Sequence, residues 1–264
     1  MRTVIALATI LAVAAPVEAS THKKAKKTAV AKKKQKHAKK KKKKAKARTL
    51  VKLSRTPTVA VASYHGDGRV RYGKDNMPPG FAWPATDAMK RASAACEQEI
   101  SDAGINFNPA PPLGVVVDPI RLPVMTIAGI DYVPSWDKGP FTLDCQLVRV
   151  LVKLGPELKN LGVREVHFGS IYRNTLVRVH GQRKNILSRH ALGLAMDIKE
   201  FVDDSGRVAN VELDYLKGDP LLHAIEDAVN RSNDFRIILT PANDPLSHAD
   251  HFHIEASVDF TAFR

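Results

Sequence analysis

Apolar residues recur at helical spacing in three parts of the chain. Residues 141–154 place four leucines on one face, and Gly155-Pro156 is typical of a helix end, so we expect this helix to stop there. Residues 220–229 form another predicted helix, with proline in its first turn. The first predicted helix spans residues 86–103, and the apolar positions on its buried face are Met89, Ala92, Cys96 and Ile100.

Four later segments, 164–170, 194–201, 235–240 and 251–258, are predicted to be strands. Alternation with a period of two is the pattern of a strand with one buried face. Because helices come early in the chain and strands come late, the order favours an α+β fold over a doubly wound sheet. We therefore expect a small, mainly antiparallel sheet with helices packed on it.

Residues 1–19 have the pattern of a secretory signal peptide. Arg2 precedes an apolar stretch, and Val17-Glu18-Ala19 resembles a cleavage site. The stretch is shorter than the roughly 20 residues of a membrane-spanning helix. The lysines that follow oppose export, because positive charge is normally retained on the cytoplasmic side. We favour cleavage, which predicts a secreted, periplasmic or cell-envelope protein with no transmembrane span in its mature form.

The net charge of +14 is concentrated in one segment. The first 48 residues carry 17 lysines and arginines against one acid, whereas the rest of the chain carries 24 basic and 26 acidic residues. Residues 20–48 have almost no large apolar side chains, so we expect a disordered Lys-rich tail. The tail is either a solvated spacer or a tether to anionic lipids or acidic envelope polymers. Nucleic acid is not the expected partner, because no aromatic residue is interleaved with the lysines for base stacking.

Residues 49–84 are predicted to be a linker, in which Gly66-Asp67-Gly68 can turn a hairpin. Three prolines at 78, 79 and 84 interrupt any regular element. The compact domain is therefore expected to span residues 85–264.

Cys96 and Cys145 are the two cysteines of the chain, and they lie in the first two predicted helices. A single pair in an exported protein favours a disulfide, with two buried free thiols as the alternative. Two cysteines are too few for a Cys-rich structural zinc cluster.

The segment "HADHFHIE", residues 248–255, concentrates histidines near the end of the chain. In an extended strand His251, His253 and Glu255 share one face. The two apolar residues between them mark the opposite face as the core side, and the same alternation turns Asp250 toward the core. The histidines are then placed together on the polar face.

The segment "SRHALGLAMDI", residues 188–198, supplies a second set of polar groups. Asp197 lies within a predicted strand, Gly193 leaves room beside it, and His190 must bend inward from the preceding turn. His190, Asp197 and His253 then form a two-nitrogen, one-oxygen shell with a fourth position for water, which is the pattern of a zinc site. A surface pair of histidines without a metal is the alternative.

Four motifs, "GPFTLDC", "GSIYR", "SRHALGLAMDI" and "HADHFHIE", resemble in this order the bacterial extensin-like C-terminal domain over residues 85–257. That family is similar in turn to zinc peptidases of the D-Ala-D-Ala carboxypeptidase, lysostaphin and hedgehog type. The resemblance implies a hedgehog/D-Ala-D-Ala-peptidase-like fold and places the same His190, Asp197 and His253 in a zinc shell. One departure is Arg189, which stands where the family usually has an acid.

The resemblance gives two candidates for the catalytic base. In the His-x-His branch the first histidine assists catalysis, which points to His251. In the carboxypeptidase branch the base is an acid three residues before the last ligand, which points to Asp250. We favour His251, because alternation turns Asp250 toward the core.

Three further residues are candidates for supporting roles. Arg173 in "GSIYR" matches an arginine that lies near substrate in the carboxypeptidase branch, where it would stabilise an oxyanion or hold a carboxylate; a surface arginine at a strand end is the alternative. Ser188 either orients His190 or shapes the turn. His248 either lines the cleft or is an ordinary loop histidine.

Together with the signal peptide and the zinc pattern, the resemblance implies an exported zinc metallopeptidase that acts on murein peptides, either a peptidoglycan endopeptidase or a carboxypeptidase. One alternative is a non-catalytic zinc-containing module that binds the cell wall, because fold similarity does not establish activity. Another is a polyanion-binding structural protein whose function lies in the tail.

Overall fold

The computed structural model describes residues 76–136, 138–179 and 182–263. The predicted signal peptide, Lys-rich tail and hairpin lie outside the described residues. Within the described ranges, no helix has both the length and the apolar character needed to cross a membrane.

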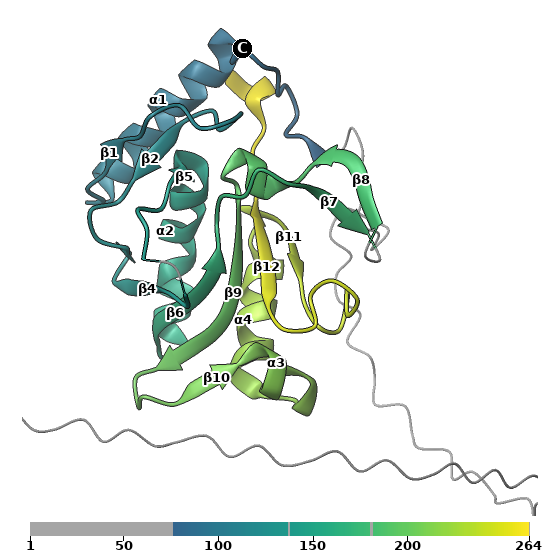
Figure 1. Cartoon of the computed structure of the whole chain (residues 1–264). Coiled ribbons are helices and arrows are strands. Elements are labelled where there is room, and N and C mark those ends of the chain that lie inside the picture. Colours follow the sequence, from purple (N-terminus) through teal and green to yellow (C-terminus); the bar gives the residue numbers. More distant parts are fainter. Residues whose placement is uncertain (1–75, 137, 180–181, 264) are drawn as a thin grey trace, which may run out of the picture. The chain divides into compact units, whose positions relative to one another are not determined.

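The described chain folds as an α+β domain, as the sequence predicts (Figure 1). Its helices are α1 (Asp87–Asp102), α2 (Cys145–Asn160), α3 (Val211–Asp214) and α4 (Pro220–Arg231), with 3₁₀ turns η3 (Arg189–Leu192), η4 (Tyr215–Lys217) and η5 (Phe260–Phe263). Its strands are β1 (Asn108–Pro109), β2 (Pro119–Arg121), β3 (Thr126–Ile127), β4 (Ile130–Pro134), β5 (Leu143–Asp144), β6 (Val163–Ser170), β7 (Leu176–Val179), β8 (Gln182–Leu187), β9 (Ala195–Asp203), β10 (Val208–Asn210), β11 (Phe235–Leu239) and β12 (Phe252–Ala256).

In the described residues the main sheet has seven strands, in the order β11-β12-β9-β6-β4-β3 with β10 paired to β9. Figure 1 shows β9 between β6 and β12. All pairs are antiparallel except β4 with β6, which is parallel. The four predicted strands are β6, β9, β11 and β12, and they form one continuous half of this sheet. The expectation of a mainly antiparallel sheet is therefore confirmed.

Two helices pack on one face of this sheet. Apolar side chains of α2 and α4 meet those of the sheet around a small apolar cavity, which is lined by Leu151, Leu154, Ile225, Val229, Val166, Ile198, Phe252 and Ile254 among others. Phe252 and Ile254 therefore point to the core, as alternation along β12 predicts. The opposite face of β6, β9 and β12 is left to polar side chains.

The second helix differs from its predicted span. α2 begins at Cys145, because Asp144 caps the helix by accepting a hydrogen bond from the Gln146 backbone at 3.0 Å. The helix does not end at Gly155-Pro156 but continues to Asn160. A Cβ at Gly155 would lie 2.4 Å from the Cβ of Ala128, so the glycine permits close packing here. The predicted helix end at Gly155-Pro156 is therefore wrong, because Gly155 allows close packing within the helix and does not end it.

Residues 76–84 pack on the domain, although the sequence assigns them to a linker. Asn76 is fully buried, and its side chain donates to the Leu187 carbonyl at 2.7 Å. The Asn76 carbonyl accepts a hydrogen bond from Arg189 Nε. The compact domain therefore includes residue 76, earlier than the expected boundary at 85.

Cys96 of α1 and Cys145 of α2 form a disulfide, as the sequence predicts. Both cysteines are buried in the contact between the two helices, and 49 positions separate them in the sequence. The bond ties the first helix to the helix that underlies the sheet.

We expect loss of this disulfide to lower the free energy of unfolding by roughly 4 kcal/mol, because a cross-link over a loop of this length restricts the unfolded chain. Chemical denaturation of the wild type and the Cys96→Ala/Cys145→Ala variant measures the difference. Thiol labelling of unreduced, denatured wild type should find no free thiol. Two reactive thiols, or an unchanged unfolding midpoint in the double variant, would contradict the expectation.

Candidate metal centre

His190 lies in a tight turn that brings its side chain toward the sheet. The turn is η3, and the Ser188 hydroxyl caps it by accepting from the His190 backbone N–H at 3.3 Å. Gly193 closes the turn in the left-handed conformation, at φ +68°. A Cβ on Gly193 would lie 2.8 Å from the backbone nitrogen of Asp144, so its space is used by that backbone rather than by Asp197. The hydrogen bond of Ser188 is to the His190 backbone, so Ser188 shapes the turn, and the ring is hydrogen-bonded by other groups.

Asp197 and His253 are directly opposite each other on neighbouring strands. β9 and β12 are antiparallel, and their register pairs these two residues. Side chains of a directly opposed pair leave the same face of the sheet. The strands thus place the carboxylate and the imidazole side by side on the face away from α2 and α4.

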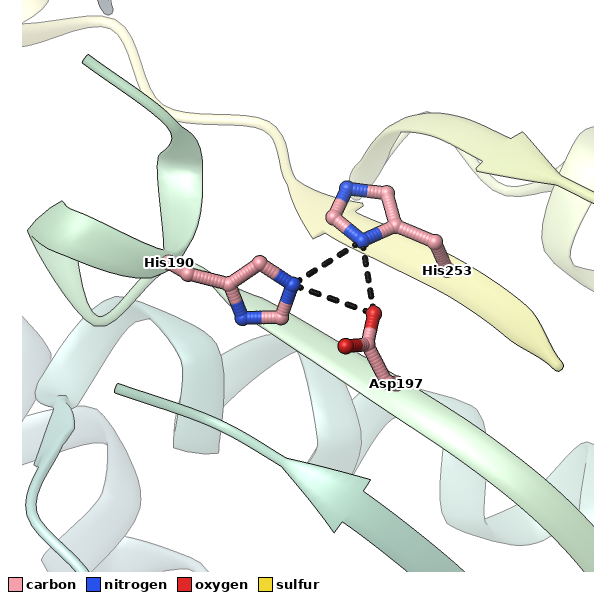
Figure 2. Close-up of side chains that lie close together, drawn as sticks. All are labelled: His190, Asp197 and His253. Carbon is pink, nitrogen blue, oxygen red and sulfur yellow. Dashed lines mark hydrogen bonds and ion pairs between the residues drawn. The ribbon is translucent and has the colours of Figure 1, made fainter. Parts of the chain in front are cut away.

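The three side chains converge on one point (Figure 2). His190 Nε2 lies 3.0 Å from Asp197 Oδ1 and 3.1 Å from His253 Nδ1, and His253 Nδ1 lies 2.9 Å from the same carboxylate oxygen. Ligands of a tetrahedral zinc ion with bonds of 2.0–2.1 Å stand about 3.3 Å apart. All three residues are buried. This group can bind a metal ion after an adjustment of a few tenths of an ångström.

The far side of each ring is hydrogen-bonded in a way that directs a nitrogen toward this point. His190 Nδ1 donates to the Ile171 carbonyl at 2.6 Å, which leaves Nε2 as the inward lone pair. His253 Nε2 donates to Glu255 Oε1 at 3.1 Å, which leaves Nδ1 inward. Glu255 is itself held by Arg236. Such outer partners are typical of metal-binding histidines, and they fit the group to this role.

The charge states of the cluster also suit a cation. Burial lowers the pKa of His190. Burial opposes ionisation of Asp197, but the histidines, first among them His190, hold its pKa well below the usual range. Burial would lower the pKa of His253 as well, yet hydrogen bonds to Asp197 and Glu255 raise it to about 9. A metal cation can take the place of the proton on His253 Nδ1, because a metal ligand must be a neutral imidazole.

Two donors hold the second oxygen of the Asp197 carboxylate. Ser170 Oγ and Arg173 Nη2 each donate to Oδ2 at 2.7 Å. The Arg173 side chain is about half exposed, so its guanidinium contacts the buried carboxylate and also reaches solvent. Sequence reasoning proposed Arg173 but missed Ser170, because a bulge between β6 and β9 decides which residue faces Asp197.

His251 and Asp250 lie beside the cluster but outside β12, which begins at Phe252. His251 Nε2 stands 3.4 Å from Asp197 Oδ1, and His251 Nδ1 donates to Asp250 Oδ1 at 2.7 Å. The Asp250 side chain is 44% exposed and also pairs with Lys199. The prediction that Asp250 faces the core is therefore wrong, because alternation does not extend into the turn before the strand.

His248 and Arg189 are the remaining residues that the sequence singled out. The His248 ring lies 4.9 Å from that of His251 and 5.2 Å from that of His253, and its Nδ1 pairs with Asp244 at 3.0 Å. Burial lowers the pKa of His248 to about 3, and the two neighbouring histidines add to this shift. His248 thus lines the site as a neutral ring. Arg189 is buried, and its Nε donates to the Asn76 carbonyl. Its charge also acts on Glu255, the hydrogen-bond partner of His253.

Comparison with known proteins gives one family match. Residues 152–263 match the model of the family described as extensin-like protein C-terminus. No curated protein and no solved structure shows significant similarity to the chain. The match begins within α2 and includes η3, β9 and β12, which carry the three converging side chains. It supports the assignment of residues 152–263 to an extensin-like C-terminal domain.

Proposed function

We propose that this chain is an exported zinc-dependent peptidase that acts on the peptides of murein. The observation that carries the proposal is the buried set of His190, Asp197 and His253, with His251 as a further imidazole at its edge. Two nitrogens and one oxygen are the protein ligands of many catalytic zinc sites, which keep a fourth position for water. A structural zinc site would instead be expected to have four protein ligands.

Zinc held by this group would supply a Lewis acid and an acidified water. The chain's own residues would handle the proton. Asp250 accepts a hydrogen bond from His251 Nδ1–H, and in that tautomer Nε2, on the side of Asp197, would carry the lone pair. His251 Nε2 is therefore placed to take a proton at the site and to return it to a leaving amine.

Arg173 would contribute charge on the open side of the site. One nitrogen of its guanidinium binds Asp197 Oδ2, while about half of the side chain is exposed. A guanidinium has five donors in a planar fork, so the same group can also bind a substrate carbonyl or carboxylate. This would hold the scissile amide next to His251.

The murein substrate rests on the family resemblance of the motifs, and a specific experiment tests it. Purified full-length protein loaded with zinc is incubated with murein sacculi, and the soluble products are analysed by mass spectrometry. New peptide termini that vanish after chelator treatment are expected. Binding to sacculi without new termini would favour the alternative, a non-catalytic zinc-containing module that binds the cell wall.

We further propose that the Lys-rich tail, residues 20–48, tethers the protein to anionic lipids or acidic envelope polymers. It carries sixteen basic residues and no acid. Binding of the mature chain to anionic vesicles should weaken steeply as salt rises, because exposed charges are screened. A tail-deleted chain, with the folded domain intact, is the matched control and should not bind. Affinity that is flat with salt, or that survives the deletion, would exclude the tether.

A further inference from the structure

Trp136 is a large apolar side chain that the fold leaves exposed. Trp136 is 65% exposed, and it lies two residues after the end of β4. Its segment is tied to the end of β6, because the Ser135 backbone N–H donates to the Phe168 carbonyl at 2.8 Å. The exposure of this tryptophan is informative, since burial of its ring is normally favourable.

Gly169 of β6 gives the indole its position. A Cβ at Gly169 would lie 2.7 and 2.8 Å from two carbons of the Trp136 ring. The Gly169 backbone does not have a positive φ, so the strand itself would accept alanine there. The missing side chain therefore serves the close approach of the ring.

Two chains of contacts join the indole to the metal centre. Gly169 precedes Ser170, whose hydroxyl donates to Asp197 Oδ2. On the other side, Lys199 Nζ lies 5.6 Å from the centre of the Trp136 ring, and Lys199 pairs with Asp250. Asp250 in turn accepts the proton of His251 Nδ1. Trp136 thus lies against the residue before Ser170 and near the lysine that pairs with Asp250.

We propose that Trp136 determines substrate specificity, by packing its indole against an uncharged aliphatic residue of the murein peptide beside the scissile bond. This inference rests on the proposed function. The charge of Lys199 is already balanced by Asp250, so Trp136 presents an apolar ring next to an ion pair with no net charge. A surface of this kind fits a small aliphatic side chain such as that of alanine better than a carboxylate.

The two tryptophans of the chain allow the contact to be observed directly. Trp83 is also exposed, at 49%, and it lies in the segment before α1, which makes it a matched control. Soluble muropeptides are titrated into zinc-loaded full-length protein carrying His251→Ala, which slows turnover. With Trp83→Phe added, the fluorescence of Trp136 should change and saturate. With Trp136→Phe added instead, the fluorescence of Trp83 should stay constant.

Affinity gives the second measurement. In the same His251→Ala protein, Trp136→Ala should raise the muropeptide Kd by at least about tenfold, because tryptophan anchors carry much of the energy of an interface. Gly169→Ala should raise the Kd too, by displacing the ring, and Trp83→Ala should leave it unchanged. Zinc content and thermal stability are measured for every variant, so that a lost fold is distinguished from a lost contact.

Three results would overturn the inference. They are an unchanged Trp136 fluorescence, an unchanged Kd in Trp136→Ala, and an equal response to murein glycan strands stripped of peptide. The last would assign the ring to a sugar. A wild type that cleaves nothing but binds muropeptides through Trp136 would refute the peptidase proposal and leave this contact standing.

Discussion

Metal analysis of the full chain is expected to give about one zinc per protein, and His253→Ala should reduce the occupancy to near zero. The ion would be held by three protein ligands, so removal of one side chain leaves only two ligands and an empty space in the buried site. His190→Ala and Asp197→Ala should have the same effect. Occupancy is measured by elemental analysis after dialysis against a weak chelator.

Two further variants sharpen this prediction. His167 is a matched control, since it too lies in a strand of the main sheet, β6, but pairs with Glu165 and Glu200 outside the cluster. His167→Ala should keep the metal. Glu255→Gln should lower zinc affinity by about 10–100-fold, because Glu255 orients the His253 ring. Full occupancy in His253→Ala would reject the assignment.

The converging set could be predicted from sequence because each part depends on a local pattern. Alternation along β9 and β12 fixes which residues leave the polar face, and this places Asp197 and His253 correctly. The need for His190 to enter from a turn follows from its distance of seven residues from Asp197. Only the pairing of the two strands had to be assumed.

The supporting groups could not be predicted because they depend on register and on contacts distant in sequence. The Ile171 carbonyl and Ser170 face the site only through the irregular pairing of β6 with β9. Glu255 was placed on the correct face by alternation, but its bond to His253 is set by side-chain geometry. Arg189 shows the same limit, since its partner Asn76 lies 113 positions away.

Asp250 shows where a correct rule was extended too far. The strand rule holds from Phe252 onward, but the turn before it carries Asp250 to a half-exposed position beside His251 and Lys199. This position changes the expected role of the carboxylate. Instead of facing the core, Asp250 lies where it would position His251 in the proposed reaction.

The roles of these two residues predict a graded loss of cleavage. His251→Ala should keep the metal and the fold but slow the release of peptide termini by about 10²–10⁴-fold, the usual contribution of a general base. Asp250→Ala should slow it less, because His251 remains but its ring is no longer held through Nδ1. Since Asp250 is 44% exposed, its removal should change the unfolding midpoint little. Initial rates with muropeptides, zinc content and thermal unfolding are measured on each variant.

Asp250→Asn separates positioning from direct proton transfer. The amide oxygen of asparagine can still accept a hydrogen bond from His251 Nδ1–H. A positioning role therefore predicts that Asp250→Asn cleaves faster than Asp250→Ala. An amide cannot act as a base, so a direct role predicts that Asp250→Asn and Asp250→Ala are equally inactive. If both are inactive while His251→Ala cleaves like the wild type, Asp250 is the base and the order of the two residues proposed here is reversed. Because all three variants leave His190, Asp197 and His253 in place, unchanged zinc content in each assigns the difference to the proton and not to the metal.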